Sequence, residues 1–200
     1  MTKALLKDIA EIRVGHTFRG KVPKDPVGEM AYLTIRDLTE GGTVSPHQLE
    51  RIEPLSVNEQ LILRHQDILL PGRGEHYRAA LFCEGERPSY PVIASNLVFI
   101  IRARPERALP LYLSWVLSQE KTESYLKGVT RGSNMLFLPK GNLEALGVDL
   151  PPLETQQRIV ELISVQQKQQ ALLKELARNS KNLTQVMVQK LVKRSAGQHK

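Results

Sequence analysis

The chain has 200 residues, of which 41% are hydrophobic and 24% charged, with one cysteine and a formal net charge of +7. This composition suits one globular domain with an appendage and excludes an intrachain disulfide framework, because Cys83 is the only cysteine. No apolar run approaches the roughly 18 residues that a membrane-spanning helix needs, and the N-terminus lacks the apolar region of a signal peptide, so we expect a soluble, cytoplasmic protein.

The positive charge is unevenly distributed along the chain. Residues 151–200 contain nine Lys or Arg and three Glu, a net charge of +6, whereas residues 1–150 contain nineteen basic and eighteen acidic residues, a net +1. A nucleic-acid hypothesis for the first 150 residues must therefore rest on local clusters of side chains and not on the total charge.

The first half of the chain predicts short elements separated by turns. Residues 4–14 have the spacing of a short amphipathic helix, or of a helix that runs into a strand. Gly15 ends this element, and a basic loop follows to Lys24. The expected strands of this half are 30–38, 61–63, 67–70, 79–83 and 92–102.

The second half predicts one helix over 109–127, a glycine-bounded loop over 128–134, a short strand at 135–138, a turn or small helix at 140–146 and a last strand at 147–150. Cys83 ends the apolar run from Ala79, which favours a buried, unreactive thiol. The fold class is therefore α+β, with many short strands and small helices in a globular domain over residues 1–150.

The C-terminal region predicts one long helix over residues 151–194, with a flexible tail at 195–200. Pro151 and Pro152 prevent a helix on their N-terminal side but suit a first turn, and no Gly or Pro follows until Gly197. At about 1.5 Å per residue the helix is on the order of 60 Å long, so it is expected to pack against another helix.

An apolar stripe along this helix has the three- and four-residue steps of a coiled-coil seam. Gln166, Gln169 and Ser180 interrupt the stripe, and polar seam residues weaken packing while fixing register and partner. The alternative is a single amphipathic helix folded back on its own domain. The predicted seam consists of Ile159, Leu162, Ile163, Leu173, Leu176, Leu183, Met187 and Leu191.

The sequence lacks the patterns of common catalytic and metal sites. The five histidines never stand at i, i+4, and there is no zinc spacing, phosphate-binding glycine loop or nucleophile elbow. We therefore expect a non-catalytic protein without a metal or cofactor.

Three polar loops carry side chains that can read DNA. Arginine can bind guanine with both of its prongs, asparagine can pair with adenine, and hydroxyls or lysines can hold phosphates. The alternative for each loop is a solvated polar turn, and Arg102, Arg104 and Arg107 are interpreted as an ordinary solvated edge. The candidate DNA-binding residues are His16, Thr17, Arg19, Lys21 and Lys24 in the first loop, Arg73, His76, Tyr77 and Arg78 in the second, and Arg131, Ser133 and Asn134 in the third.

The sequence resembles the DNA specificity (S) subunits of type I restriction-modification systems. The most specific stretch is Pro151 to Ile159, which matches the family pattern Pro-Pro-Leu-x-x-Gln-x-x-Ile. The loop after Leu70 departs from the family's Ser/Thr-x-x-Gly, so base contacts cannot be transferred. Five stretches carry the resemblance, in the family's order: 6–12 leading to Gly15-His16-Thr17, 32–38, 66–70, Gly132-Ser133 before an apolar strand, and 150–160. Arg36, in the second stretch, is a further candidate DNA-binding residue.

The resemblance implies a target-recognition domain followed by a helix for dimerisation and methyltransferase binding. Typical S subunits are about twice as long and have two recognition domains, so this chain resembles a half-size form that would pair through its helix. The implied role is to direct adenine methyltransferase subunits, with or without a restriction subunit, to a split and palindromic double-stranded DNA site.

Two alternatives remain at this stage. The chain could be an accessory or regulatory half-subunit that assembles with a full-length specificity subunit or a methyltransferase without reading DNA. It could also be an unrecognised enzyme such as a nuclease, which a metal-dependent cleavage test would reveal.

Overall fold

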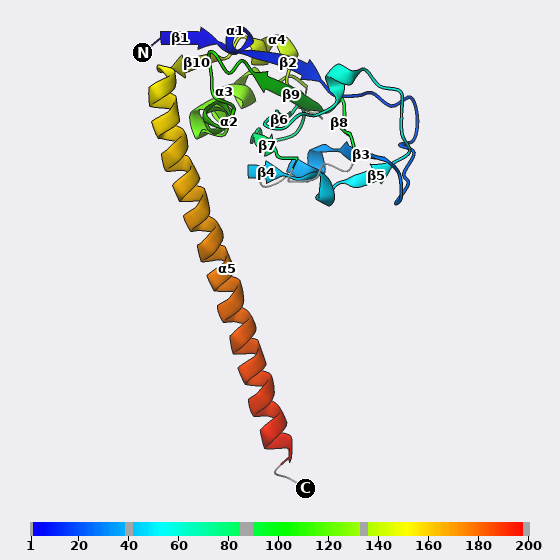
Figure 1. Ribbon diagram of the computed structural model, residues 1–200, viewed down its shortest axis with the longest axis vertical. Coiled ribbons are helices and arrows are strands. Elements are labelled where there is room, and N and C mark those ends of the chain that lie inside the picture. The colour runs from blue at the N-terminus through cyan, green and yellow to red at the C-terminus, as the bar shows by residue number, and fades with distance from the viewer. Residues whose placement is uncertain (1, 39–41, 85–89, 133–135, 198–200) are drawn as a thin grey trace. The chain divides into compact units, whose positions relative to one another are not determined.

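The computed structural model describes residues 2–38, 42–84, 90–132 and 136–197, with residues 190–197 as backbone only (Figure 1). It has two compact units, residues 1–157 and residues 158–200. The expected α+β class, with many short strands and a long C-terminal helix, is confirmed. Within the described residues, no helix combines the length and the apolarity needed to cross a membrane.

The largest element of the first unit is a five-stranded sheet. Its neighbouring strands are antiparallel, except for the parallel pair at one edge formed by β7 and β4. The strands are, in spatial order, β2 (Ala10–Val14), β9 (Val98–Ala103), β6 (Ile68–Pro71), β7 (Ala80–Phe82) and β4 (Gly42–Val44).

A three-stranded sheet packs against the larger one. Its central strand β3 (Met30–Leu33) pairs antiparallel with β5 (Glu50–Ile52) and parallel with β8 (Val92–Ala94). The first and last strands of the unit, β1 (Thr2–Leu5) and β10 (Gly147–Leu150), form a separate antiparallel pair.

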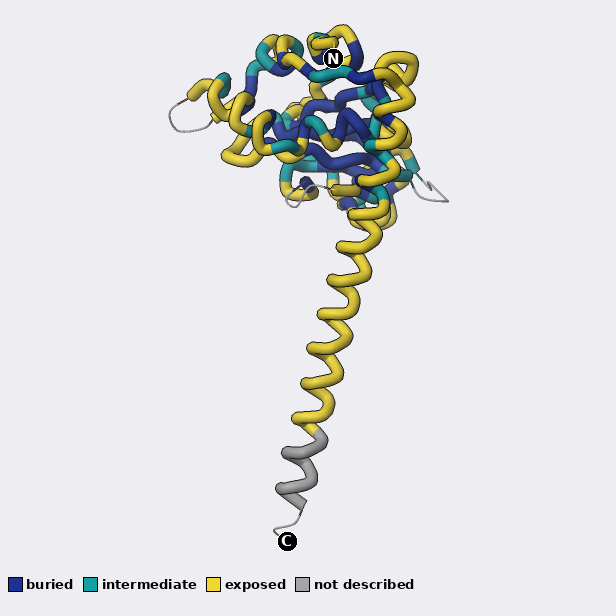
Figure 2. Tube along the Cα trace, turned by 90° about the vertical axis from the view of Figure 1, so that its left-hand side faces the viewer, coloured by how far each residue is buried: buried dark blue, intermediate teal, exposed yellow. Residues whose placement is uncertain are grey.

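The core lies on both faces of the five-stranded sheet, which explains why its central strands are almost entirely apolar, with Arg102 of β9 as an exception. Ile68 and Leu70 of β6 and Ile101 of β9 join the cluster under the helices. Leu69 and Ile100, which alternate with them, join the cluster that faces the three-stranded sheet. Figure 2 shows these strands as the buried centre of the first unit.

The helices of the first unit are α1 (Leu6–Ile9), α2 (Pro110–Leu117), α3 (Glu120–Val129) and α4 (Lys140–Glu144). The prediction of one helix over 109–127 is wrong, because the chain breaks after α2. Ser118 Oγ donates to Ser114 O at 2.9 Å, and Thr122 Oγ1 donates to Val116 O at 2.8 Å. These hydroxyls add a second hydrogen bond to carbonyl groups in the last turn of α2, which also accept from Ser118 N and Gln119 N.

Several expected strands are shorter than predicted or absent. Residues 92–102 form two strands in different sheets, separated by a turn at 95–97. The region 30–38 ends as the 3₁₀ helix η1 (Ile35–Leu38), and η3 (Glu59–Leu61) replaces the start of the expected strand 61–63. A third 3₁₀ helix is η2 (Pro46–Gln48). In the expected strand 135–138, Phe137 makes only isolated β-bridges, and Met135 lies outside the described residues.

The long helix α5 (Leu153–Gly197) starts from a hydrogen-bonded anchor. The Gln156 side chain is fully buried, and its Oε1 accepts from Leu109 N at 2.9 Å. Its Nε2 donates to Arg107 O at 3.1 Å and to Pro151 O at 2.9 Å. Gln156 therefore joins the first turn of α5 to the segment between β9 and α2, and it is the glutamine of the Pro-Pro-Leu-x-x-Gln pattern.

Candidate nucleic-acid interface

Two of the loops proposed to bind DNA meet at the turn 95–97, between β8 and β9. The carbonyl oxygen of His16 accepts a hydrogen bond from Asn96 N at 2.9 Å, and Gly72 N donates to Leu97 O at 2.7 Å. The turn therefore holds the first and second candidate loops through main-chain bonds, which do not depend on the identity of the exposed side chains.

The close approach of the first loop to this turn requires a glycine. A Cβ atom at Gly15 would lie 2.3 Å from the carbonyl oxygens of both Ala94 and Ser95, so no side chain fits there. In the second loop, Gly74 has a φ of +107°, a backbone conformation that residues with a side chain rarely adopt. These two glycines allow the turns that carry His16 and Arg73.

The second and third loops meet at Phe137, which pairs with one arginine on each side. Arg131 and Phe137 exchange two main-chain hydrogen bonds, of 3.0 and 2.9 Å. On the other side Arg73 stands opposite Phe137, between the bonds from Gly74 N to Leu136 O (3.2 Å) and from Leu138 N to Gly72 O (2.9 Å). The side chains of Arg73, Phe137 and Arg131 are all exposed.

The second loop does not expose all of its candidate residues. His76 and Arg78 are exposed, but Tyr77 between them is fully buried, so the prediction that Tyr77 binds DNA is wrong. Burial raises the pKa of Tyr77, and the neighbouring Thr130 hydroxyl opposes this shift. Tyr77 is a core residue that supports the loop from below.

Helix α3 provides a carboxylate to the same loop. Glu123 Oε1 lies 3.3 Å from His76 Nδ1 and 2.9 Å from Lys127 Nζ. The Lys127 ammonium lowers the pKa of Glu123, an effect that burial opposes and His76 reinforces. Part of the positive charge of this loop region is therefore neutralised within the protein.

The first loop covers the outer face of the three-stranded sheet. Phe18 packs edge-on against both His16 and Tyr32, with centroids 4.9 Å apart in each pair. This contact orders the middle of the loop, while Thr17, Arg19 and Lys21 remain exposed.

A hollow of about 320 Å³ is lined by Arg36 and by Lys24, which is at the end of the first loop. Lys24 forms an ion pair with Glu50 at 2.6 Å. Asp37 accepts from Thr34 N at 2.7 Å and from Thr34 Oγ1 at 2.8 Å. Arg36 is exposed, so this hollow adds a guanidinium to the part of the surface that the first loop forms.

One expected solvated arginine is instead part of an internal ion pair. Arg102 Nε and Nη2 donate to the two carboxylate oxygens of Asp67, at 2.7 and 2.6 Å, and Asp67 is 1% exposed. This pair raises the pKa of Arg102, although burial opposes the shift. Asp67 also accepts from Arg64 N at 2.8 Å. The interpretation of Arg102 as solvated is wrong, while Arg104 and Arg107 are exposed as expected.

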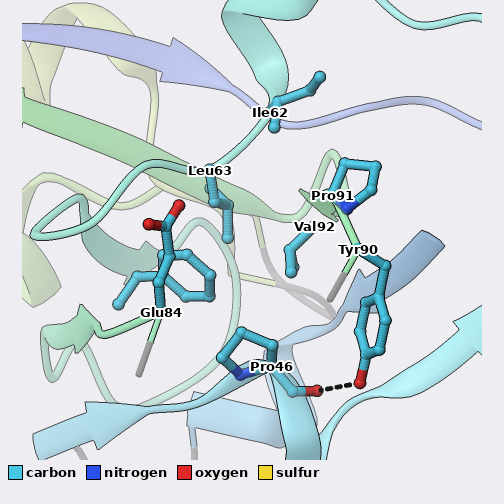
Figure 3. Close-up of a pocket in the computed structure, with 8 residues that line it drawn as sticks. Pro46, Ile62, Leu63, Glu84, Tyr90, Pro91 and Val92 are labelled. Atoms are coloured by element: carbon cyan, nitrogen blue, oxygen red, sulfur yellow. Dashed lines mark hydrogen bonds between the residues drawn. The ribbon is translucent and has the colours of Figure 1, made fainter. Parts of the chain in front are cut away.

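A second hollow, of about 310 Å³, is lined mostly by apolar residues, none of which belongs to these loops (Figure 3). The Tyr90 hydroxyl at its edge donates to Pro46 O at 3.3 Å. Leu63 and Val92 in its wall belong to the core between the two sheets.

Cys83 is half-buried, and burial raises the pKa of its thiol, as expected for an unreactive cysteine.

Two exposed residues of this surface were not found by sequence reasoning. Asn96 is exposed at the centre of the turn 95–97, inside a run that periodicity assigned to one strand. Phe137 is 42% exposed, and sequence analysis predicted only a short strand at its position. Its pairing with Arg73 and Arg131 and the burial of the adjacent Leu138 indicate its position. Ser133 and Asn134 lie outside the described residues.

The second unit is the rest of α5, and its predicted seam is largely solvent-exposed in the single chain (Figure 2). Leu162, Leu173, Leu176, Leu183 and Met187 have relative exposures between 56% and 72%. Ile159 is half-buried, Ile163 is buried, and the Leu191 side chain lies outside the described residues.

A family model described as the type I restriction modification DNA specificity domain matches residues 1–180. The chain belongs to this family. The match confirms the resemblance found in the Pro-Pro-Leu-x-x-Gln pattern and the four stretches before it. No curated protein matches the chain in sequence.

Solved structures of the family's S subunits share the fold. The HsdS subunit from Thermoanaerobacter tengcongensis is 19% identical with a TM-score of 0.61, over 87% of this chain and 39% of that one. The type I S subunit from M. genitalium is 13% identical with a TM-score of 0.55, over 82% and 38%.

A third similar chain comes from a structure concerned with complex assembly and conformational transition of the type I R-M system. It is 17% identical with a TM-score of 0.61, over 87% of this chain and 40% of that one. The chain thus spans about two fifths of the length of the structures that it matches.

Proposed function

We propose that this chain is a DNA-recognition subunit of a type I restriction-modification complex, in which the globular unit reads one half-site of double-stranded DNA. The observation that carries the proposal is the gathering of loops: main-chain bonds at the turn 95–97 and at Phe137 join three loops rich in arginine and polar side chains. Arginines and amides on exposed loops are suited to base edges, and lysines and hydroxyls to phosphates.

The helix α5 provides the association surface in this proposal. A row of leucines with more than half of their surface exposed is costly for a single chain in water and is typical of a partner-binding surface. Two copies paired through this seam present two identical recognition units. A two-fold dimer matches a palindromic target, with a spacer between half-sites that is set by the protein.

The catalytic step is assigned to other subunits. The third similar structure concerns assembly of a type I R-M system. By analogy, adenine methyltransferase subunits bind this chain, with or without a restriction subunit. In this role the exposed arginine loops bind DNA, and the exposed seam of α5 binds the partner subunits.

The test is the selection of binding sites from a randomised duplex pool, with the full chain alone and with its methyltransferase subunit. We expect a split palindromic motif. Arg73→Ala and Arg131→Ala should each weaken binding to that motif by about 1–3 kcal/mol if they contact bases.

Arg64→Ala is the matched control, because it removes the same charge from an exposed position at the opposite end of β6. It should change binding only through the small, salt-dependent effect of net charge. If the methyltransferase binds the chain but no motif is selected and the arginine variants have no effect, the accessory role replaces the DNA-reading role.

A further inference from the structure

The row Arg131–Phe137–Arg73 presents an aromatic ring between two cations on the outside of the first unit. Residues directly opposite each other in an antiparallel ladder project from the same face, with Cβ atoms roughly 4.5–5.5 Å apart. Phe137 is opposite both arginines, through a hydrogen-bonded pair with Arg131 and a non-hydrogen-bonded pair with Arg73. The three side chains therefore leave the ladder on one face.

The outward direction of Phe137 follows from its neighbour. Leu138 is 3% exposed and belongs to the core cluster under the helices. Successive residues of an extended segment point to opposite sides. Phe137 therefore points away from that core, which agrees with its 42% exposure.

An exposed phenylalanine between two arginines fits a polyanion that also has an apolar group within reach. Double-stranded DNA has both properties, since phosphates flank a groove in which the thymine 5-methyl group is the apolar feature of the base edges. The faces of stacked bases are not accessible in an undistorted duplex, so the methyl group is the partner that the geometry favours.

We propose that Phe137 is a specificity-determining residue that contacts a thymine 5-methyl group in the major groove, while Arg73 and Arg131 bind the neighbouring phosphates or base edges. This inference rests on the proposed function, because it names the contact that one residue makes in the DNA site. It adds a base preference that the polar loop residues alone do not provide.

The first experiment compares the motifs that the full chain and its Phe137→Ala variant select from a randomised duplex pool. We expect the wild-type motif to contain a thymine whose preference is lost in Phe137→Ala and retained in Phe137→Leu. Leu136→Ala is the matched control, because Leu136 is the adjacent apolar residue and is 36% exposed on the opposite side of the same segment. It should leave the preference unchanged, and thermal melting should verify that every variant is folded.

The second experiment replaces that thymine by deoxyuridine in a fixed duplex, which removes only the methyl group. Wild-type affinity should fall about fourfold, the value of one buried methyl group. The affinity of Phe137→Ala should not change.

The outcomes separate this inference from the proposed function. If wild type selects a motif and Phe137→Ala selects the same motif with the same deoxyuridine effect, the inference fails and the proposed function stands. An affinity loss in Phe137→Ala that is equal for all sequences also overturns the inference. If wild type selects no motif, the proposed function fails and the inference falls with it.

Discussion

Adjacent residues in the loop after β6 face opposite environments. His76 and Arg78 are exposed, whereas Tyr77 is buried in the core cluster under the helices. Composition marks all three as polar candidates for DNA contact, but an extended segment alternates its side chains between the two sides. The loop therefore has a buried tyrosine that fixes it and exposed polar side chains that can bind.

The first residue-level prediction concerns Tyr77→Phe, which should leave DNA affinity unchanged because the hydroxyl is buried. Burial raises the pKa of Tyr77 above its ordinary value of 10.0, so the folded protein holds this proton more tightly than the unfolded chain. That contribution to stability is complete below pH 10 and is lost as the pH rises above it.

Urea unfolding at pH 7, 9.5 and 11 measures this effect. At pH 7 the variant should lie within about 1 kcal/mol of wild type. At pH 11 wild type should have lost more stability than Tyr77→Phe. Parallel pH curves for the two proteins would show that the Tyr77 proton is not linked to folding.

At the level of elements, the first turn of α5 depends on Gln156. Its amide both donates and accepts, and its three main-chain partners belong to the same compact unit. A buried amide that is fully hydrogen-bonded specifies one arrangement of the segments that it joins, because any other leaves polar groups without partners.

Gln156→Leu should destabilise the first unit by about 3 kcal/mol, because it leaves Leu109 N and the Arg107 and Pro151 carbonyl oxygens without these partners. For a chain of this size the melting temperature should fall by roughly 6–12 °C.

Gln156→Glu should be destabilised at neutral pH and recover towards pH 4, where a protonated carboxyl can donate again. The exposed neighbour Thr155→Ala should stay within about 0.5 kcal/mol of wild type. Equal melting temperatures for Gln156→Leu and Thr155→Ala would contradict the role of the anchor.

The sequence was sufficient for elements whose pattern is local. The long α5 and the strand β6 follow from periodicity, glycine and proline positions and apolar runs. The turn 95–97 was not found, because the strands on both sides are buried on two faces, so the apolar residues before and after Ser95 and Asn96 were interpreted as one strand. Asn96 was lost from the candidate site for the same reason.

Non-local pairing explains the other differences between prediction and structure. Arg102 pairs with Asp67, 35 residues away, and no spacing rule indicates such a partner. Phe137 is apolar and follows a loop, so composition assigns it to the core. Its outward position depends on the ladder with Arg73 and Arg131, and Arg73 is far from both other residues in the sequence.

At the scale of the whole molecule, the proposed function assigns recognition to the first unit and association to the second. The first unit has a packed core and polar loops, whereas the second exposes a row of large apolar side chains. A helix on the order of 60 Å long has no core of its own. In the proposed function, its stability in water comes from a partner helix.

The last prediction is that Leu176→Asp disrupts a dimer formed through this seam. Burying one leucine contributes about 1.5–3 kcal/mol, and a two-fold dimer loses two of them, so the dissociation constant should rise at least a hundredfold. Ala171→Asp is the matched control, because it introduces the same charge on the opposite side of α5, where it should leave the dimer intact. Gln169→Leu should tighten association, since it replaces a polar seam residue by an apolar one. Light scattering over a range of concentrations should then give twice 22.6 kDa for wild type, Ala171→Asp and Gln169→Leu, and 22.6 kDa for Leu176→Asp. A wild-type mass of 22.6 kDa at every concentration would contradict the homodimer and leave the seam to the methyltransferase subunit or to a second specificity chain.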